Sequence, residues 1–253
     1  MNFTSPLKIV SRAVALTLIA PTSWLLAAQP DSSEKKITGP ELAAELCSLQ
    51  PSTNAHFSGL LKIRKSDGRF FEVPITCNVI TGAASWKVVY QTAGSDELPV
   101  EKLTVVHFAT GPSQLFLARA NKRGDPLEEK ALAAEQVCAP LAGSDFWFQD
   151  LALDFFHWPE QKIVTSEMRK GRACYLLESV NPRPVPGGYA LVRSWVDKES
   201  GGLLLAEAYD QKKNLLKEFS VRSFKKVDSV WQLQEMEIRD VTTRSRTRIE
   251  FDL

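Results

Sequence analysis

The chain has 253 residues, with 31 Lys and Arg against 30 Asp and Glu and three His, so its formal net charge at pH 7 is +1. A protein whose main partner is a nucleic acid normally carries a strongly basic face, and this balance argues against that class. No internal repeat or low-complexity linker divides the chain. Since one all-β domain can reach this length, a single domain is expected.

The first residues have the pattern of a secretion signal. Lys8 and Arg12 supply the positive start, residues 13–20 are mostly apolar, and Leu26-Ala27-Ala28 resembles a cleavage site before Gln29. An uncleaved membrane anchor is the alternative. A proline, a threonine and a serine interrupt the apolar run, which is shorter than the ~20 residues that a membrane span needs. The pattern therefore favours cleavage.

This interpretation divides the chain into a signal peptide, residues 1–28, and one domain, residues 29–253. Cleavage removes two basic residues and no acidic ones, so the net charge of the exported domain becomes about −1. We expect that domain to be soluble and periplasmic.

Four cysteines lie in the predicted exported domain: Cys47, Cys77, Cys138 and Cys174. An oxidising compartment permits disulfides, and four cysteines allow three complete pairings, among which the sequence does not choose. Cys77 lies on the apolar face of a predicted strand, so a buried free thiol is the alternative for it.

The first half of the exported domain begins with a helix and continues as strands. Gly39-Pro40-Glu41 starts the helix, since Pro suits a first helical turn, and Pro51 ends it. Alternating apolar and polar residues then predict strands over residues 57–64, 71–79, 86–90, 102–108 and 114–118. Pro74 predicts that the second of these is bulged or at an edge. Residues 121–142 fit a helix or a strand.

The second half repeats the strand pattern. Strands are predicted over residues 163–168, 173–179, 189–195, 203–209, 215–224, 231–238 and 246–253. One charged face along such strands is typical of an antiparallel sheet with water on one side. A sheet this long curls or closes, so its apolar face becomes concave and needs a cover. Helices at 40–50 and 144–158 are the candidates for that cover.

The densest group of aromatic residues lies in residues 143–159, which we call the aromatic segment. A helix over 144–158 places five side chains on one apolar face: Phe148, Leu151, Ala152, Phe155 and Phe156. Ser144 is the predicted N-cap, Asp145 lies in the first turn, and Pro159 ends the helix. From this pattern alone, the face is either ordinary core or a lid over an apolar cavity.

The opposite face of this predicted helix carries Asp150, Asp154 and His157. These side chains have the spacing of a metal or acid–base cluster, but a solvated polar face is the favoured interpretation, because no other His is near in sequence. His56 and His107 fall within strand patterns. No serine has a G-x-S-x-G context, and no cysteine has a catalytic setting. We therefore predict no catalytic residue, no metal, no cofactor and no enzyme activity.

Several motifs resemble those of the LolA/LolB-like outer-membrane lipoprotein-sorting proteins, over roughly residues 140–253. The first is the signature G-S-D-F-x-x-x-D-L, which residues 143–151 match. The others are Phe155-Phe156-His157-Trp158-Pro159-Glu160-Gln161, Cys174-Tyr175-Leu176-Leu177-Glu178, Ser194-Trp195-Val196-Asp197, Ala206-Glu207-Ala208-Tyr209-Asp210 and Arg246-Thr247-Arg248-Ile249-Glu250-Phe251. A common closing motif, T-G-x-x-T, has Arg244 in place of its glycine here.

This resemblance implies a mainly β fold, a curved antiparallel half-barrel with short covering helices. It also implies a monomeric periplasmic carrier that binds acylated lipoproteins or other lipids, without nucleic acid, and that contacts membrane-bound loading and receiving proteins transiently. The expected apolar lid or cavity residues are Trp147, Phe148, Leu151, Phe155 and Phe156. The alternative is a non-enzymatic module on the same fold that senses lipids or lipoproteins.

Overall fold

The computed structural model describes residues 37–94, 98–120, 124–227 and 230–253. The predicted signal peptide and its cleavage site lie outside these ranges. Within them, no helix has the length and apolar character needed to cross a membrane.

One antiparallel sheet of thirteen strands dominates the structure, in the order β6-β5-β4-β3-β2-β1-β13-β12-β11-β10-β9-β8-β7. The strands of the first half are β1 (Ala55–Arg64), β2 (Phe70–Ile80), β3 (Ser85–Thr92), β4 (Val100–Phe108), β5 (Gln114–Ala120) and β6 (Lys130–Ala131). Those of the second half are β7 (Glu160–Arg169), β8 (Arg172–Val180), β9 (Leu191–Asp197), β10 (Leu203–Tyr209), β11 (Leu215–Val227), β12 (Val230–Asp240) and β13 (Ser245–Phe251).

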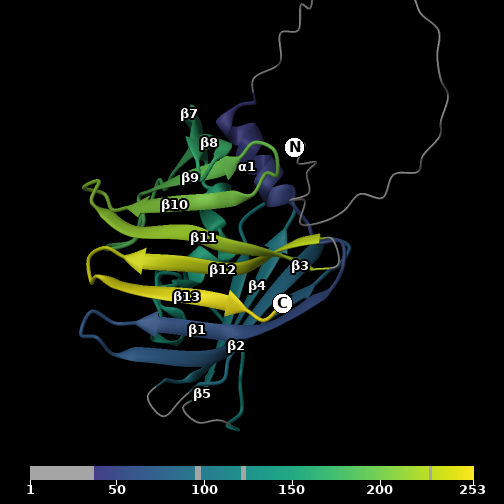
Figure 1. Cartoon of the computed structure of the whole chain (residues 1–253), viewed down its shortest axis with the longest axis vertical. Helices are drawn as coiled ribbons and strands as arrows, with labels where there is room; N and C mark the ends of the chain where they lie inside the picture. Colours follow the sequence, from purple (N-terminus) through teal and green to yellow (C-terminus); the bar gives the residue numbers. More distant parts are fainter. Residues whose placement is uncertain (1–36, 95–97, 121–123, 228–229) are drawn as a thin grey trace, which may run out of the picture.

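The strand order places the two halves of the chain side by side, with β1 paired to β13 in the middle of the sheet (Figure 1). The sheet is not closed. Its two edges are β6 and β7, which follow each other in the sequence and do not pair. The connection from Ala131 to Glu160 must therefore cross from one edge to the other. It contains the aromatic segment, the helix α2 (Phe148–Ala152) and the 3₁₀ turns η1 (Ala134–Gln136), η2 (Leu141–Gly143) and η3 (Asp154–His157).

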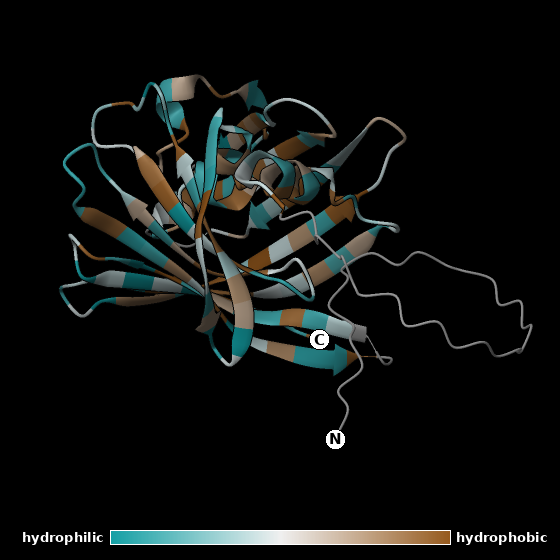
Figure 2. Ribbon diagram, turned by 90° about the horizontal axis from the view of Figure 1, so that it is seen from above, coloured by the Kyte–Doolittle hydropathy of each residue, from teal (hydrophilic) through white to brown (hydrophobic). Residues whose placement is uncertain are grey.

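The helical elements lie within the curve of the sheet, as the view from above shows (Figure 2). Along β13, buried residues alternate with partly exposed ones, as the sequence pattern predicted. On the outer face of this strand, Glu250 pairs with Lys62 at 2.5 Å and Arg248 pairs with Glu237 at 2.6 Å. A polar convex face and an apolar concave face confirm the prediction of a mainly β, curved antiparallel sheet with short covering helices.

Pro74 lies in an interior strand, so the prediction of an edge strand is wrong for β2 as a whole, and no bulge interrupts its pairing with β1. The physical reason is local. Pairing between β2 and β3 begins only at Ile75, so Pro74 needs no backbone N–H toward that side.

The predicted helix at 40–50 is present as α1 (Gly39–Ser48). Thr38 caps it, and the carboxylate of Glu41 accepts the backbone N–H of Thr38 at 2.9 Å, which completes a capping box. A Cβ at Gly39 would collide with the backbone carbonyl of Gln161, so glycine allows this end of α1 to lie directly on β7. Leu42 is buried on the face that meets the sheet.

All four cysteines are free. Cys77 and Cys174 are buried, as proposed for Cys77, and burial raises the pKa of the Cys77 thiol to about 12. Burial and the nearby carboxylate of Asp154 raise the pKa of Cys47 to about 11. These two thiols are therefore protonated and unreactive at neutral pH.

Candidate functional site

The aromatic segment does not form the single helix predicted over 144–158. Leu153, with φ of 53°, takes a left-handed conformation that ends α2 after five residues, and η3 follows directly. Ser144 does not cap α2, since its hydroxyl accepts the backbone N–H of Phe146 at 3.1 Å in a preceding turn. Trp147 occupies the N-cap position, and the Asp150 carboxylate accepts its N–H at 2.8 Å.

Asp145 is the reason that the helix begins late. Instead of lying in a first helical turn, this side chain is buried and accepts hydrogen bonds from the hydroxyls of Ser245 and of Thr247, the latter at 2.7 Å. Its backbone N–H also donates to the Thr247 hydroxyl at 2.9 Å. The first and last motifs of the resemblance therefore meet in space. Arg244 adopts φ of 62° at the place of the missing glycine, so the turn keeps a left-handed residue there.

The break at Leu153 divides the predicted lid residues between two apolar clusters. The first cluster joins Phe148 and Leu151 to inward side chains of β1–β5, β12 and β13. The second cluster joins Phe155 and Phe156 to side chains of α1 and β8–β10. These four side chains are at most 6% exposed, and Trp147 is partly buried against the second cluster. The segment thus fills the concave side of both halves of the sheet.

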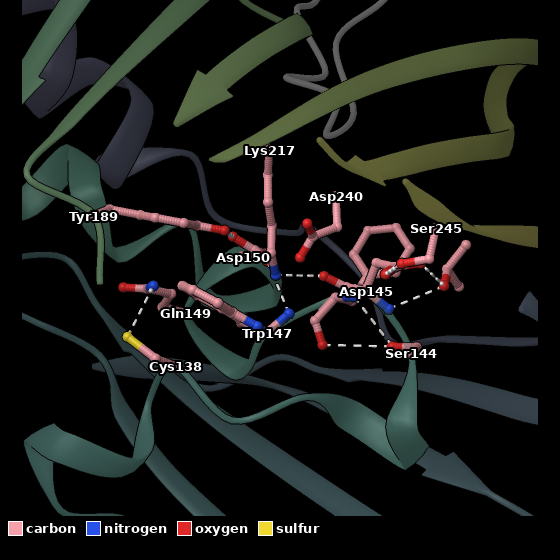
Figure 3. Close-up of polar contacts among 12 residues, drawn as sticks. Cys138, Ser144, Asp145, Trp147, Gln149, Asp150, Tyr189, Lys217, Asp240 and Ser245 are labelled. Carbon is pink, nitrogen blue, oxygen red and sulfur yellow. Dashed lines mark hydrogen bonds and ion pairs between the residues drawn. The ribbon is translucent and has the colours of Figure 1, made fainter. Parts of the chain in front are cut away.

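Lys217 forms the polar centre between the two clusters, and it extends from β11 toward the aromatic segment (Figure 3). Its side chain is 2% exposed. Its ammonium donates to the backbone carbonyl of Asp145 at 2.5 Å, lies 3.6 Å from the centre of the Trp147 ring and lies 3.6 Å from Oδ2 of Asp150. Burial lowers the pKa of Lys217, while the charge of Asp150 opposes that shift. The ring contact adds a cation–π attraction in a site removed from water.

Asp150 was predicted to lie on a solvated face, and that prediction is wrong. Its carboxylate accepts the Tyr189 hydroxyl at 2.8 Å as well as the Trp147 N–H, and Tyr189 stacks on the Trp147 ring at 4.9 Å (Figure 3). Burial raises the pKa of Asp150, while Lys217 and the two hydrogen bonds lower it. Because α2 is short and lies inside the sheet, both of its faces meet protein.

The other predicted polar residues lie apart from this centre. Asp154 accepts the backbone N–H of Ser113 at 2.9 Å, while the Ser113 hydroxyl bonds to Nδ1 of His107 at 3.1 Å. His107 stacks on Trp86 at 3.9 Å. Burial, and next the charge of His157, lower the pKa of His107 to about 4. The carboxylate binds a backbone amide and not the imidazole, so these residues lack the order of a Ser–His–Asp triad.

Within the described residues, no group of three or more His, Cys, Asp and Glu side chains is arranged to hold a metal ion. The metal or acid–base cluster of Asp150, Asp154 and His157, which was the less favoured interpretation, is not formed, because the turn at Leu153 separates Asp150, which binds Tyr189, from Asp154, which binds Ser113.

A small cavity lies between the aromatic segment and strands β9–β12, within the second half of the sheet. Its polar end is formed by Lys217, Asp150 and Tyr189, and Phe155 forms part of its apolar wall. The cavity has a volume of about 30 Å³. This room suits one or two water molecules.

A wider hollow of about 500 Å³ lies beside β5 and β6. Its walls carry Arg119, Glu128 and Lys130 next to Leu117 and Leu132. The charged rim and shallow setting suit water better than an apolar ligand, so the smaller interior cavity is the stronger candidate.

Comparison with known proteins supports the fold. A protein-family model described as "-like: Uncharacterized protein" matches residues 128–252. A solved structure of a DUF1329 family protein from Desulfovibrio piger is 18% identical, with a TM-score of 0.68 over 85% of this chain and 90% of that one. A putative outer membrane lipoprotein-sorting protein domain from Vibrio parahaemolyticus is also 18% identical, with a TM-score of 0.69 over 85% and 90% of the two chains. A LolA superfamily protein from Nitrosomonas europaea is 14% identical, with a TM-score of 0.59 over 86% and 93%.

The fold is LolA-like. At these identities the likeness concerns architecture, and no match is found among curated proteins. The LolA-like sheet places the aromatic segment on its concave side, as the resemblance implied. Sequence reasoning missed Lys217 and Tyr189. A signal for Lys217 was present in the sequence, because it interrupts the apolar alternation of Leu215, Phe219 and Val221.

Proposed function

We propose that the protein is a periplasmic carrier that binds lipid-modified proteins through their acyl chains and sorts them toward the outer membrane. The observation that carries this proposal is the place of the aromatic segment. It connects the two unpaired edges of an open LolA-like sheet and lines the concave side with large apolar side chains. The motif resemblance and the LolA-like fold also support a carrier function.

The physical basis is exchange of one apolar contact for another. An acyl chain on the concave side replaces contacts that side chains of the segment make in its absence. Each buried CH₂ contributes about 0.8 kcal/mol, so a partly buried chain binds with useful affinity and still leaves. In this proposal Trp147, Phe155 and Phe156 form the wall that yields to the chain and then contacts it, while Phe148 and Leu151 hold the segment in the first cluster.

The carrier needs no catalytic step, and the polar groups of the segment serve to position it. Asp145, Asp150 and Lys217 bind one another and the backbone, and Ser113 and His107 do not form a triad with Asp154. We further propose a monomer that meets its loading and receiving proteins only transiently.

The test is recovery of the tagged protein from a periplasmic extract, followed by mass spectrometry of bound lipoproteins. Trp147→Ala should reduce the recovered lipoprotein several-fold, since this ring lies between Lys217 and Tyr189. The matched control is Trp231→Ala, which removes an indole that is 36% exposed. Equal recovery from both variants, or none from the parent protein, contradicts the proposal.

A second step separates the carrier from a sensing module on the same fold. The loaded protein is mixed with outer-membrane vesicles, and lipoprotein is measured in the vesicle fraction. A carrier releases its cargo to the vesicles. Retention of bound lipoprotein under all acceptor conditions favours the sensing module.

A further inference from the structure

We propose that the cavity beside Lys217 receives the carbonyl end of a neutral acyl group, an ester or amide, with the hydrocarbon tail directed away from it along β10. This inference rests on the proposed function, because it names the part of the ligand that the interior recognises. It predicts that the protein distinguishes ester or amide acyl groups from free fatty acids and from plain hydrocarbon.

The buried ammonium of Lys217 has one strong hydrogen bond to the protein. An ammonium group has three N–H donors. One donates to the carbonyl of Asp145, the Trp147 ring faces the charge, and the distance of 3.6 Å to Asp150 is an ionic contact that is longer than a hydrogen bond. The donor that faces Asp150 is therefore weakly bonded, although the side chain is 2% exposed. The same side chain lines the cavity, where a ligand oxygen can accept that hydrogen.

The charges around Lys217 favour a neutral ligand over an anionic one. Lys217 is the one cation among the cavity-lining residues, and three carboxylates act on it. The Asp150 carboxylate is 3.6 Å from the Lys217 ammonium. Asp145 is the residue whose backbone carbonyl accepts from Lys217, and Asp240 is the cross-strand partner of Lys217 on β12 (Figure 3). The carboxylate of a free fatty acid would meet net negative charge here. A neutral carbonyl oxygen gains the hydrogen bond without that repulsion.

The apolar end of the cavity has room along β10. Ala206 and Ala208 of β10 leave space along the cavity wall, where larger side chains would fill it. Leu153, which is 39% exposed and lines the cavity, places one end of it near the surface. A tail that starts at Lys217 therefore passes the two alanines and reaches solvent beside Leu153.

The cavity holds only water-sized molecules as it stands, so the Phe155 side chain must turn to admit the ligand. The amide of Gln161 donates to the carbonyls of Phe155 and Trp158, both at 2.9 Å, and its oxygen accepts the Ser179 hydroxyl at 2.7 Å. These bonds hold the backbone of η3 on β7. The Phe155 side chain borders the existing space, so its rotation enlarges the cavity without loss of these bonds.

The experiment measures displacement of a fluorescent acyl probe by three ligands of similar length at pH 7: methyl laurate, tetradecane and laurate. The parent protein should bind the ester about tenfold more tightly than the hydrocarbon, since only the ester offers an oxygen that accepts a hydrogen bond from the charged Lys217. The ester should also bind more tightly than laurate. Lys217→Met should reduce the ester preference to less than twofold, while Lys62→Met, a change on the outer face of β1, should retain it.

A pair of valine variants covers the case in which Lys217→Met does not fold. Val192→Leu adds a methylene to the cavity wall, and Val105→Leu adds the same group to the first cluster. The first change should weaken binding of all three ligands several-fold, and the second should leave it within twofold.

The outcomes separate this inference from the function on which it rests. If none of the three ligands displaces the probe from the parent protein, both the proposed function and this inference are overturned. Equal binding of ester and hydrocarbon, tighter binding of laurate, or an ester preference that survives in Lys217→Met overturns this inference alone. Unchanged binding in Val192→Leu places the ligand elsewhere and also overturns it.

Discussion

The two ends of the aromatic segment are built differently. The first end is held by many polar bonds: Glu101 accepts the N–H of Ala142 at 2.5 Å, Lys65 donates to the carbonyl of Gly143, and Asp145 binds β13. Phe146 and Phe148 at this end are at most 1% exposed. The second end has Phe155 beside a cavity with a charged wall. One continuous segment therefore combines an anchor in the first cluster with an adaptable wall in the second.

A high density of aromatic residues in a sequence therefore does not show whether each ring belongs to the core or borders a cavity. Phe148 and Phe155 are seven residues apart and were predicted to share one helix face, yet they pack in separate clusters because Leu153 turns the chain between them. The role of each ring is decided by whether its neighbours close around it.

The largest effect is expected for Phe148→Ala. This ring is 0% exposed in the first cluster, so its removal leaves a cavity among packed neighbours and should lower the free energy of unfolding by about 3–5 kcal/mol. Urea unfolding at pH 7 measures the change. A loss below about 1 kcal/mol would mean that this end of the segment is not core.

Phe155→Ala should cost roughly 1–2 kcal/mol less than Phe148→Ala, because Phe155 already borders empty space. The same change should alter affinity for a fluorescent acyl probe more than Phe148→Ala does, when both are compared at equal fraction folded. Equal losses of stability with unchanged probe affinity would show that the two ends do not differ.

The pH dependence of stability should reflect His107, which lies at the contact of η3 with the β4–β5 turn. Its pKa of about 4 in the folded protein is below its ordinary value of 6.5, so the unfolded chain binds the proton first as pH falls. Stability is therefore lost between about pH 6.5 and 4, by roughly 2–3 kcal/mol from this group. His107→Phe, which keeps a ring against Trp86, should remove that part of the dependence, while His56→Phe should not.

The smallest expected effect is that of Asp145→Asn. The amide keeps one oxygen acceptor but presents an NH₂ group to a hydroxyl, so one buried hydrogen bond is lost, at about 1–2 kcal/mol. Thr247→Ser, which keeps the hydroxyl, is the conservative control. An unfolding midpoint in urea equal to that of the parent protein would show that the anchor contributes nothing measurable.

Sequence periodicity by itself determined most of the sheet. Alternation over residues 246–253 and its counterparts predicted the strands and their wet outer face, because side chains of a strand point to opposite sides in turn. Gly39-Pro40-Glu41 predicted the start of α1, since capping depends on residues adjacent in the chain. Pro74 shows the limit of such patterns. Alternation predicted the strand β2, but not that its pairing with β3 begins only after Pro74.

Only the tertiary structure decided the form of the aromatic segment. Local spacing favoured a helix over 144–158, but Asp145 is bound by Thr247, 102 residues away, and Lys217 binds it from 72 residues away. Such long-range hydrogen bonds outweigh helix propensities, which amount to at most about 1 kcal/mol for residues other than proline. The pairing of β1 with β13 brings these partners together, and no pattern within fifteen residues contains that information.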